Sequence, residues 1–186
     1  MIPQSYTFIK KETDESGFDM ASNLDVCHLL RSLARSKISS DFLELGTGTG
    51  LATSFILDGM DEKSTLVSID NDANCLDIAK RNLAQNARLT LIETDGGVWL
   101  ANNKNAKFDF IFADTWHGKY LMLEEVLKMV NIGGFYIIDD MLPQSNWPEG
   151  HDKKVDELKK VLRNKDDFSI VEMNWASGII IATRTN

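Results

Sequence analysis

Three aspartates stand where two apolar segments of the chain end. Asp114 closes FDFIFAD at residues 108–114, and Asp139 and Asp140 close GFYIIDD at residues 134–140. If both segments are neighbouring parallel strands, their carboxyl ends meet beside a common ligand site. Three carboxylates brought together repel one another, which favours a raised pKa or a cation between them. We therefore predict a site for Mg²⁺ or another divalent cation at these aspartates. The alternative is that Asp114 serves another ligand and the other two cap a loop.

A glycine-rich segment, ELGTGTG at residues 44–50, joins an apolar run to a helical pattern. Glycines at alternate positions let the backbone turn tightly and approach a ligand, and a following helix N-terminus offers free N–H groups. Twenty residues after Gly50, Asp70 ends the next apolar run, where a carboxylate can accept hydrogen bonds from ribose hydroxyls. The residues predicted to contact a nucleoside ligand here are Glu44, Gly46, Thr47, Gly48, Gly50, Asp70 and Asn71. Asn71, however, together with Asp72, is more typical of a helix start.

Two ligands compete for this loop. The dinucleotide fingerprint requires a glycine one residue later, where this chain has Leu51. Glu44, before the first glycine, suits a ligand with a cationic amino group and would be a poor neighbour for a pyrophosphate. A nucleoside with an amino group is therefore favoured, with NAD as the runner-up and a purely structural turn as the remaining alternative.

Side chains that could move a proton follow Asp114. His117 can accept a proton near pH 7 when neutral, and Lys119 is a second candidate base. The alternative for His117 is that it caps or packs beside the loop. The irregular stretch MLPQSNWPEGH at residues 141–151 is expected to overhang this region, with Trp147 either lining it or pinning the loop to the body. His151 is expected to begin a charged helix.

These residues must be positioned by short apolar strands that alternate with helical patterns. The strands are predicted at 42–45, 64–70, 88–94, 108–114 and 134–139, with two more in DFSIVEM and GIIIATR near the end. Helical spacing relates Met20, Leu24, Cys27, Leu30 and Ala34, with Ser22 and Asp25 at capping-box spacing. It also relates Leu76, Ala79 and Leu83; Leu123, Val126, Leu127 and Val130; and Val155, Leu158 and Leu162.

The last two strands are joined by only four residues, 174–177, which cannot hold a crossover helix. They must therefore form an antiparallel hairpin. The chain is predicted to be one α/β domain over residues 1–186. Its fold is a Rossmann-like, doubly wound, mostly parallel seven-stranded sheet with a C-terminal antiparallel hairpin.

Composition narrows the classes of function. The 186 residues carry 20 basic and 28 acidic side chains, a net charge of −8 that repels phosphate backbones and anionic lipid. Nucleic-acid and membrane partners are therefore not expected, and the apolar runs are too short to span a bilayer. Two cysteines fit no metal-ligand spacing, so a reducing cytoplasmic setting is expected.

FLELGTGTG, Asp70, the TDG sequence at residues 94–96 and the strand ending in Asp114 resemble the class I S-adenosylmethionine-dependent methyltransferases. The resemblance covers nearly the whole chain. It implies that Glu44 and the glycine loop hold the methionine part and Asp70 the ribose. It also implies that Asp95, with Gly96, holds the adenine amino group and that Trp116 lies against the adenine.

The order of motifs is similar to that of the catechol and caffeoyl-CoA O-methyltransferase branch, in which Asp, Asp and Asn occupy the positions of Asp114, Asp139 and Asp140. His117 stands where that branch has its catalytic Lys. The Asn/Asp-Pro-Pro-aromatic motif of amino-methylating relatives is absent after Asp114. The resemblance thus implies O-methylation of a small-molecule hydroxyl, with Asp114 beside His117 or Lys119 in the catalytic site. The site is expected to be shallow, or to be completed by a second subunit of a homodimer. A catalytically silent S-adenosylmethionine-binding module is the alternative from another class.

Overall fold

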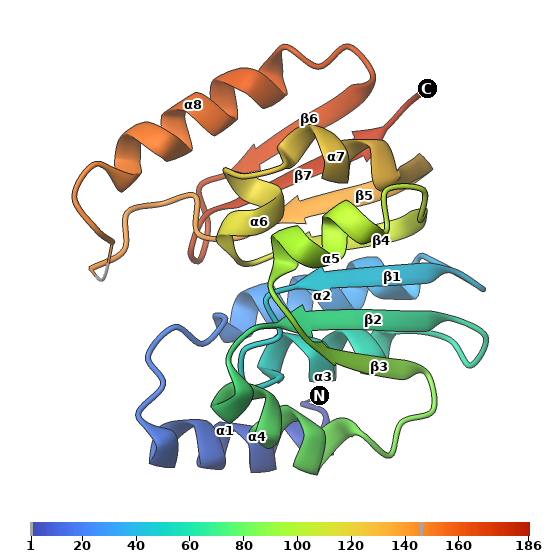
Figure 1. Cartoon of the computed structure of the whole chain (residues 1–186), viewed down its shortest axis with the longest axis vertical. Coiled ribbons are helices and arrows are strands. Elements are labelled where there is room, and N and C mark those ends of the chain that lie inside the picture. Colours follow the sequence, from blue (N-terminus) through green and yellow to red (C-terminus); the bar gives the residue numbers. More distant parts are fainter. Residues whose placement is uncertain (1, 146) are drawn as a thin grey trace.

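The computed structural model describes residues 2–145 and 147–186 and contains a seven-stranded sheet (Figure 1). The strands are β1 (Asp41–Leu45), β2 (Thr65–Asp70), β3 (Leu89–Glu93), β4 (Phe108–Ala113), β5 (Val130–Ile138), β6 (Phe168–Met173) and β7 (Ile179–Arg184). They lie in the order β3-β2-β1-β4-β5-β7-β6, and only β7 runs antiparallel to its neighbours. The predicted fold class, including the hairpin, is confirmed.

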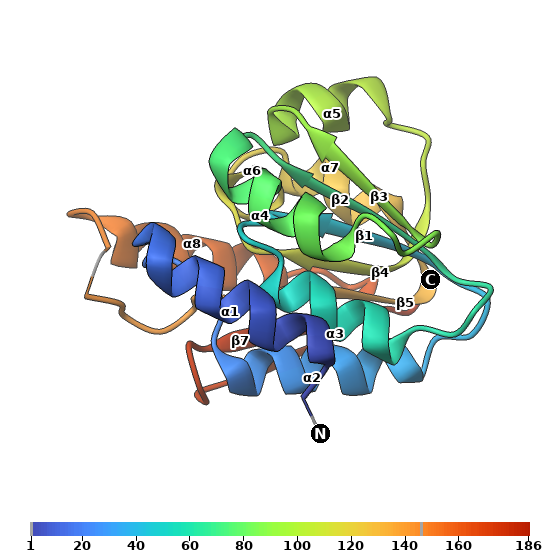
Figure 2. The ribbon, with the colours of Figure 1, turned by 90° about the horizontal axis from the view of Figure 1, so that it is seen from below.

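Helices cover both faces of the sheet (Figure 2). One face carries α1 (Gln4–Ser16), α2 (Leu24–Arg35), α3 (Leu51–Gly59) and α4 (Ala73–Leu83). The other carries α5 (Gly96–Asn102), α7 (Leu123–Met129) and α8 (His151–Arg163). Neighbouring residues of one strand, such as Phe42 and Leu43, therefore enter different cores. This double coverage explains why the strands are apolar on both sides.

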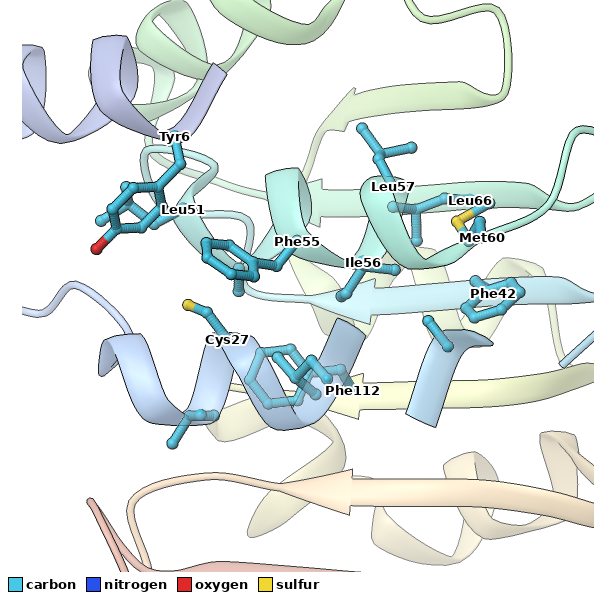
Figure 3. Packing of buried hydrophobic residues seen from close by; sticks show 14 of the residues in the cluster. Tyr6, Cys27, Phe42, Leu51, Phe55, Ile56, Leu57, Met60, Leu66 and Phe112 are labelled. Atoms are coloured by element: carbon cyan, nitrogen blue, oxygen red, sulfur yellow. The ribbon is translucent and has the colours of Figure 1, made fainter. Parts of the chain in front are cut away.

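Helix α1 has no counterpart among the predicted elements. Its sequence is mostly polar, and only Tyr6, Ile9 and Thr13 are buried. Figure 3 shows Tyr6 beside Phe55 of α3, and the two ring centroids lie 5.1 Å apart in an edge-on arrangement. Helix α1 is therefore held by tertiary packing rather than by a strong apolar pattern of its own.

The start of α2 differs from its prediction. Met20 lies outside the helix with 66% of its surface exposed. The helix begins at Leu24, and the side chain of Asn23 caps it by accepting a hydrogen bond of 2.8 Å from the backbone N–H of Asp25. Ser22, the predicted cap, donates instead to Asp114 at 3.1 Å, so the capping-box pattern here marked a long-range contact. Similarly, Val130 begins β5 instead of ending α7.

The hairpin places its turn at the carboxyl end of β5. Strand β7 pairs with β5 through Ile138 and Ile180, and with β6 on its other side. The turn residue Ser177 consequently lies beside Asp139, to which its hydroxyl donates a hydrogen bond. No helix in the described part of the chain is long and apolar enough to cross a membrane.

Candidate functional site

A cavity of about 600 Å³ opens at the carboxyl ends of the central strands. Its wall includes residues 46–49 after β1, 70–72 after β2, 114–116 after β4, and Asp139 and Asp140 after β5. This is the edge at which doubly wound sheets bind ligands, on either side of the point where the strand order reverses between β1 and β4. Of the predicted site residues, Glu44, Gly50, Asp95, Gly96 and His117 do not line this cavity.

The glycine loop is held open by its backbone. Gly46 and Gly48 have φ angles of 99° and 52°, in the left-handed region that favours glycine. A side chain on Gly46 would place its Cβ 2.7 Å from the carbonyl oxygen of Asp114, so β4 leaves no space for one. Gly50 has a different function from the one predicted, because its Cα faces α4, where a Cβ would lie 3.1 Å from that of Ala79.

Glu44 lies beneath the loop and is fully buried. Its Oε2 accepts hydrogen bonds from Thr53 and Ser68, and the Ser68 hydroxyl lies 2.6 Å from that of Thr47 in the loop. Its Oε1 has no hydrogen-bond partner among the described residues. Glu44 does not itself line the cavity, and hydrogen bonds link its carboxyl to the loop through the Ser68–Thr47 pair. Direct contact between Glu44 and a ligand stays a prediction. Burial raises the pKa of Glu44 to about 8, with Ser68 and Thr53 opposing the rise.

Glu44→Gln is expected to change how stability depends on pH. The carboxyl ionises near 4.5 when unfolded but near 8 when folded, so the unfolded state holds fewer protons between those values. The contribution of Glu44 to the free energy of unfolding is therefore full below about pH 4.5. It falls by up to about 1.4 kcal/mol per pH unit as the pH rises toward 8. Urea denaturation at pH 5 and pH 8 should show wild type losing stability relative to Glu44→Gln. An unchanged difference would contradict the burial effect.

Asp70 lies at the end of β2 and faces the glycine loop across the cavity wall. Its Oδ2 accepts a 2.7 Å hydrogen bond from the N–H of Gly48, and its Oδ1 accepts one of 2.9 Å from Asp72. Each carboxylate oxygen retains a further lone pair for a ligand hydroxyl. Asn71 lines the cavity beside it, whereas Asp72 caps α4 through the N–H groups of Asn74 and Cys75, as predicted.

The structure separates the two candidate bases. His117 packs against the start of α5, where a Cβ on Gly97 would lie 2.8 Å from its Nε2. Its Nδ1 lies 3.8 Å from Asp95, which caps α5 through the N–H of Val98. Gly96 is the first residue of α5, and a Cβ on it would lie 3.1 Å from that of His117. His117, Asp95 and Gly96 thus form one group that is not part of the cavity lining.

Lys119 lies on the cavity side of the same short segment, α6 (Trp116–Lys119). Only 4% of its surface is exposed, and its Nζ lies 3.3 Å from Oδ1 of Asp114. The chain reverses between the two side chains because Gly118 adopts a φ of 92°. The hydroxyl of the buried Tyr136 donates to the carbonyl of Gly118 and fixes this turn.

Gly118→Ala is expected to destabilise the fold and disturb Lys119 together. A Cβ at this φ is strained, and it would lie 2.7 Å from Cδ1 of Leu45. We expect a loss of about 1–3 kcal/mol in the free energy of unfolding, measured by urea denaturation. Gly133→Ala is a matched control, since Gly133 also has a positive φ of 75° but has open space around it. Equal losses in the two variants would show that strain alone, and not the contact with Leu45, sets the cost.

The three aspartates all line the cavity, and two of them, Asp114 and Asp139, accept hydrogen bonds from the protein's own donors. Asp114 accepts from Lys119 and Ser22, and Asp139 accepts from Ser177 and, at 2.7 Å, from the N–H of Asp140. Burial and the neighbouring Asp114 raise the pKa of both Asp139 and Asp140, while the charge of Lys119 lowers them. In the described part of the chain, no group of three or more His, Cys, Asp or Glu side chains is arranged to hold a metal ion. The arrangement therefore differs from the predicted cation site, and the residues as placed do not fit a divalent ion.

An aromatic cluster closes the other end of the cavity. His151 begins α8 as predicted, but it also lines the cavity, and its Nε2 lies 3.1 Å from the hydroxyl of Tyr120. The ring centroid of Trp147 lies 4.6 Å from that of His151, and the centroid of Trp116 lies 5.8 Å away. Trp147 thus lines the cavity and also packs against the rest of the protein. Asn146, which belongs to the irregular stretch predicted at residues 141–151, lies outside the described residues. Burial, then Lys119 and Lys154, lower the pKa of His151.

Sequence reasoning missed the cavity residues that come from the segment between α1 and α2. Phe18 and Ser22 line the wall opposite the glycine loop. A Cβ on Gly48 would lie 3.5 Å from the Phe18 ring. Tyr120 and Ser177 were also missed. Tyr120 directly follows the candidate base Lys119, but nothing in the sequence pattern pointed to Phe18.

The sheet order, with an antiparallel β7, a glycine loop after β1 and an acid ending β2, defines a class I methyltransferase fold. The O-methyltransferase family model matches residues 7–185. The chain therefore belongs to the O-methyltransferase family.

Solved structures share this fold at low sequence identity. TomG from Streptomyces achromogenes, an O-methyltransferase involved in tomaymycin synthesis and solved with SAM, is 18% identical with a TM-score of 0.83, covering 98% of this chain and 90% of its own. The O-methyltransferase from Bacillus cereus, solved with SAH, is 18% identical with a TM-score of 0.85 (97% and 90% covered). A candidate caffeoyl-CoA O-methyltransferase from Staphylococcus aureus is 18% identical with a TM-score of 0.79 (97% and 92% covered). No curated protein sequence matches the chain significantly.

Proposed function

We propose that this O-methyltransferase transfers the methyl group of S-adenosylmethionine to a hydroxyl oxygen of a small molecule, as a single domain. The observation that carries the proposal is that one cavity brings two sets of residues together. The glycine-loop residues and Asp70 line it from the segments that follow β1 and end β2, and Lys119, Tyr120, Trp147 and His151 line it from segments that follow β4 and β5. Family membership supports the reaction type, and the SAM and SAH bound to two structural neighbours support the donor.

The donor part of the cavity fits S-adenosylmethionine. The donor supplies a methyl group on a positively charged sulfur. Gly46, Thr47 and Gly48 would hold its methionine part close to the backbone, and Asp70 and Asn71 its ribose. Trp116, with 43% of its surface exposed at the cavity, offers a face to the adenine, and His117, Asp95 and Gly96 would support the adenine side from behind.

The acceptor part lies against the aspartates and the aromatic cluster. Methyl transfer requires an acceptor oxygen aligned with the methyl carbon, so positioning carries much of the catalysis. Asp114 and Lys119 lie where β4 meets the cavity and are our candidates for the groups that act on the acceptor. Trp147 and Tyr120 form an apolar wall suited to a planar acceptor.

The test is donor binding followed by turnover. Calorimetry with the purified chain should show S-adenosylmethionine binding in the micromolar range. A panel of phenols, catechols and hydroxy acids should then yield a methylated product with release of S-adenosylhomocysteine. Donor binding without turnover on any acceptor would favour the silent binding module, and a preference for NAD would overturn the proposal.

We also propose a setting and an assembly. Cys27 and Cys75 are both free and buried, as expected for a protein of the reducing cytoplasm. The assembly we propose is a homodimer in which a second subunit would complete the acceptor part of the cavity. Sedimentation analysis with and without donor tests the assembly, and a monomer under both conditions would exclude it.

A further inference from the structure

We propose that the ammonium group of Lys119 takes the place of a divalent cation among Asp114, Asp139 and Asp140, so that the protein methylates a single hydroxyl without a metal. This inference rests on the proposed function for its reaction. It concerns how the acceptor oxygen is held, which family membership alone does not fix.

Lys119 lies in the cavity wall beside Asp114. Its side chain is almost fully buried, and its Nζ lies 3.3 Å from Oδ1 of Asp114. Asp139 and Asp140 line the same cavity. A lysine is rarely buried without a carboxylate partner, because an unpaired buried charge is costly. The ammonium is thus the cation that this acidic corner of the cavity contains.

The ammonium and a divalent ion compete for the oxygens of Asp114. Mg²⁺ requires near-octahedral oxygen ligands at about 2.1 Å. Here Asp114 already accepts from Lys119 on one oxygen and from Ser22, at 3.1 Å, on the other. Oδ1 of Asp139 accepts both from Ser177 and from the N–H of Asp140, so the competition with an ion is sharpest at Asp114, where both oxygens already have donors. An ion bound to Asp114 would also lie close to the ammonium, and like charges at such a distance repel strongly.

The backbone around Gly118 fixes Lys119 in this position. The positive φ of Gly118 turns His117 and Lys119 to opposite sides, and Tyr136 holds the Gly118 carbonyl from the core. Leu45 of β1 leaves no space for a side chain at residue 118. The ammonium is therefore preorganised and not a mobile surface group that happens to lie nearby.

The proposed course of methyl transfer follows from the single positive charge of the Lys119 ammonium. An acceptor hydroxyl that binds beside Nζ loses its proton to solvent water, and the ammonium stabilises the remaining oxyanion. The oxygen then forms a bond to the methyl carbon while the methyl–sulfur bond breaks and the sulfur keeps the electron pair. Lys119 stays protonated throughout. Only one acceptor oxygen is needed beside Nζ, so a vicinal diol gains no advantage over a monohydroxy compound.

The experiment measures metal binding directly, independently of turnover. Wild type, Lys119→Met and Lys119→Arg are stripped with chelator, checked for folding by circular dichroism, and titrated with Mn²⁺ alone by electron paramagnetic resonance. We expect Lys119→Met to bind Mn²⁺ at least about tenfold more tightly than wild type, because a like charge has been removed. Lys119→Arg should resemble wild type. Adding the substitution Asp114→Asn to Lys119→Met should abolish the gain in Mn²⁺ affinity.

Turnover of a monohydroxy phenol in chelator gives the second measurement. Wild type should keep its rate, and Lys119→Arg should keep more of it than Lys119→Met, because arginine retains the charge but cannot act as a base. Mn²⁺ binding by wild type as tight as that by Lys119→Met, or loss of wild-type turnover in chelator, would overturn the inference. If Lys119→Met does not fold, the turnover of wild type and of Lys119→Arg in chelator still tests the inference. Failure of the proposed function itself would instead appear as absent donor binding.

Discussion

Lys119→Ala is expected to lower kcat by about 10²–10⁴-fold in chelator-treated protein, whereas His117→Ala is expected to change it by less than about threefold. Lys119 is buried in the cavity wall beside Asp114, so its loss removes a group next to the acceptor oxygen. His117 packs against Gly96 and Gly97, outside that wall. Its loss should appear mainly in the KM for the donor.

Steady-state rates with a confirmed acceptor, at saturating donor, measure both variants. Lys104→Ala removes the same charge from an exposed lysine and serves as the matched control. Calorimetric donor affinity should be nearly unchanged in Lys119→Ala. Full turnover by both single variants would show that neither side chain acts on the acceptor. A greater loss in His117→Ala would mean that the segment rearranges when the donor binds.

Asp70→Ala is expected to weaken S-adenosylmethionine binding by about 5- to 150-fold, which corresponds to about 1–3 kcal/mol. Two effects add. The ribose hydroxyls lose their acceptor, and the N–H of Gly48 loses the 2.7 Å hydrogen bond that positions the glycine loop. Asp70→Asn should fall between wild type and Asp70→Ala, because an amide oxygen can still accept from Gly48.

Calorimetric titration of the donor measures this series. Asp77→Ala removes the same charge from an exposed position on α4 and should bind like wild type. An unaltered dissociation constant in Asp70→Ala would mean that the ribose lies elsewhere. An equal loss in Asp77→Ala would attribute the effect to net charge.

The fold could be predicted because its signals are local. Strands covered on both faces, separated by helical patterns, identify a doubly wound sheet, and a four-residue connection permits only a hairpin. Helix α1 was missed since its mostly polar sequence packs through only a few side chains. The predicted Ser22 cap was wrong for a related reason: its hydroxyl satisfies Asp114 from a distant part of the chain, and spacing cannot reveal such a partner.

The sequence predicted which residues belong to the candidate site, but it did not predict how these residues are arranged in space. Strand ends identified Asp70, Asp114 and Asp139 as cavity residues. The sequence does not show how deeply a side chain is buried, so Glu44 was predicted to contact the ligand, whereas in the structure it is fully buried beneath the loop. His117 and Lys119, two residues apart, were treated as equivalent. Their separation depends on the φ of Gly118, which a sequence pattern does not encode.

The reversal of strand order between β1 and β4 has an evolutionary consequence. In the proposed assignment, the residues that face the donor come mainly from the ends of β1 and β2, on one side of that point, while Tyr120, Trp147 and His151 come from segments that follow β4 and β5. A change in the second group would then redirect the protein to a new acceptor without altering the first. Selection on donor affinity and selection on acceptor choice would act on separate stretches of the gene. A lineage with this architecture would diversify its substrates while its donor chemistry stays intact.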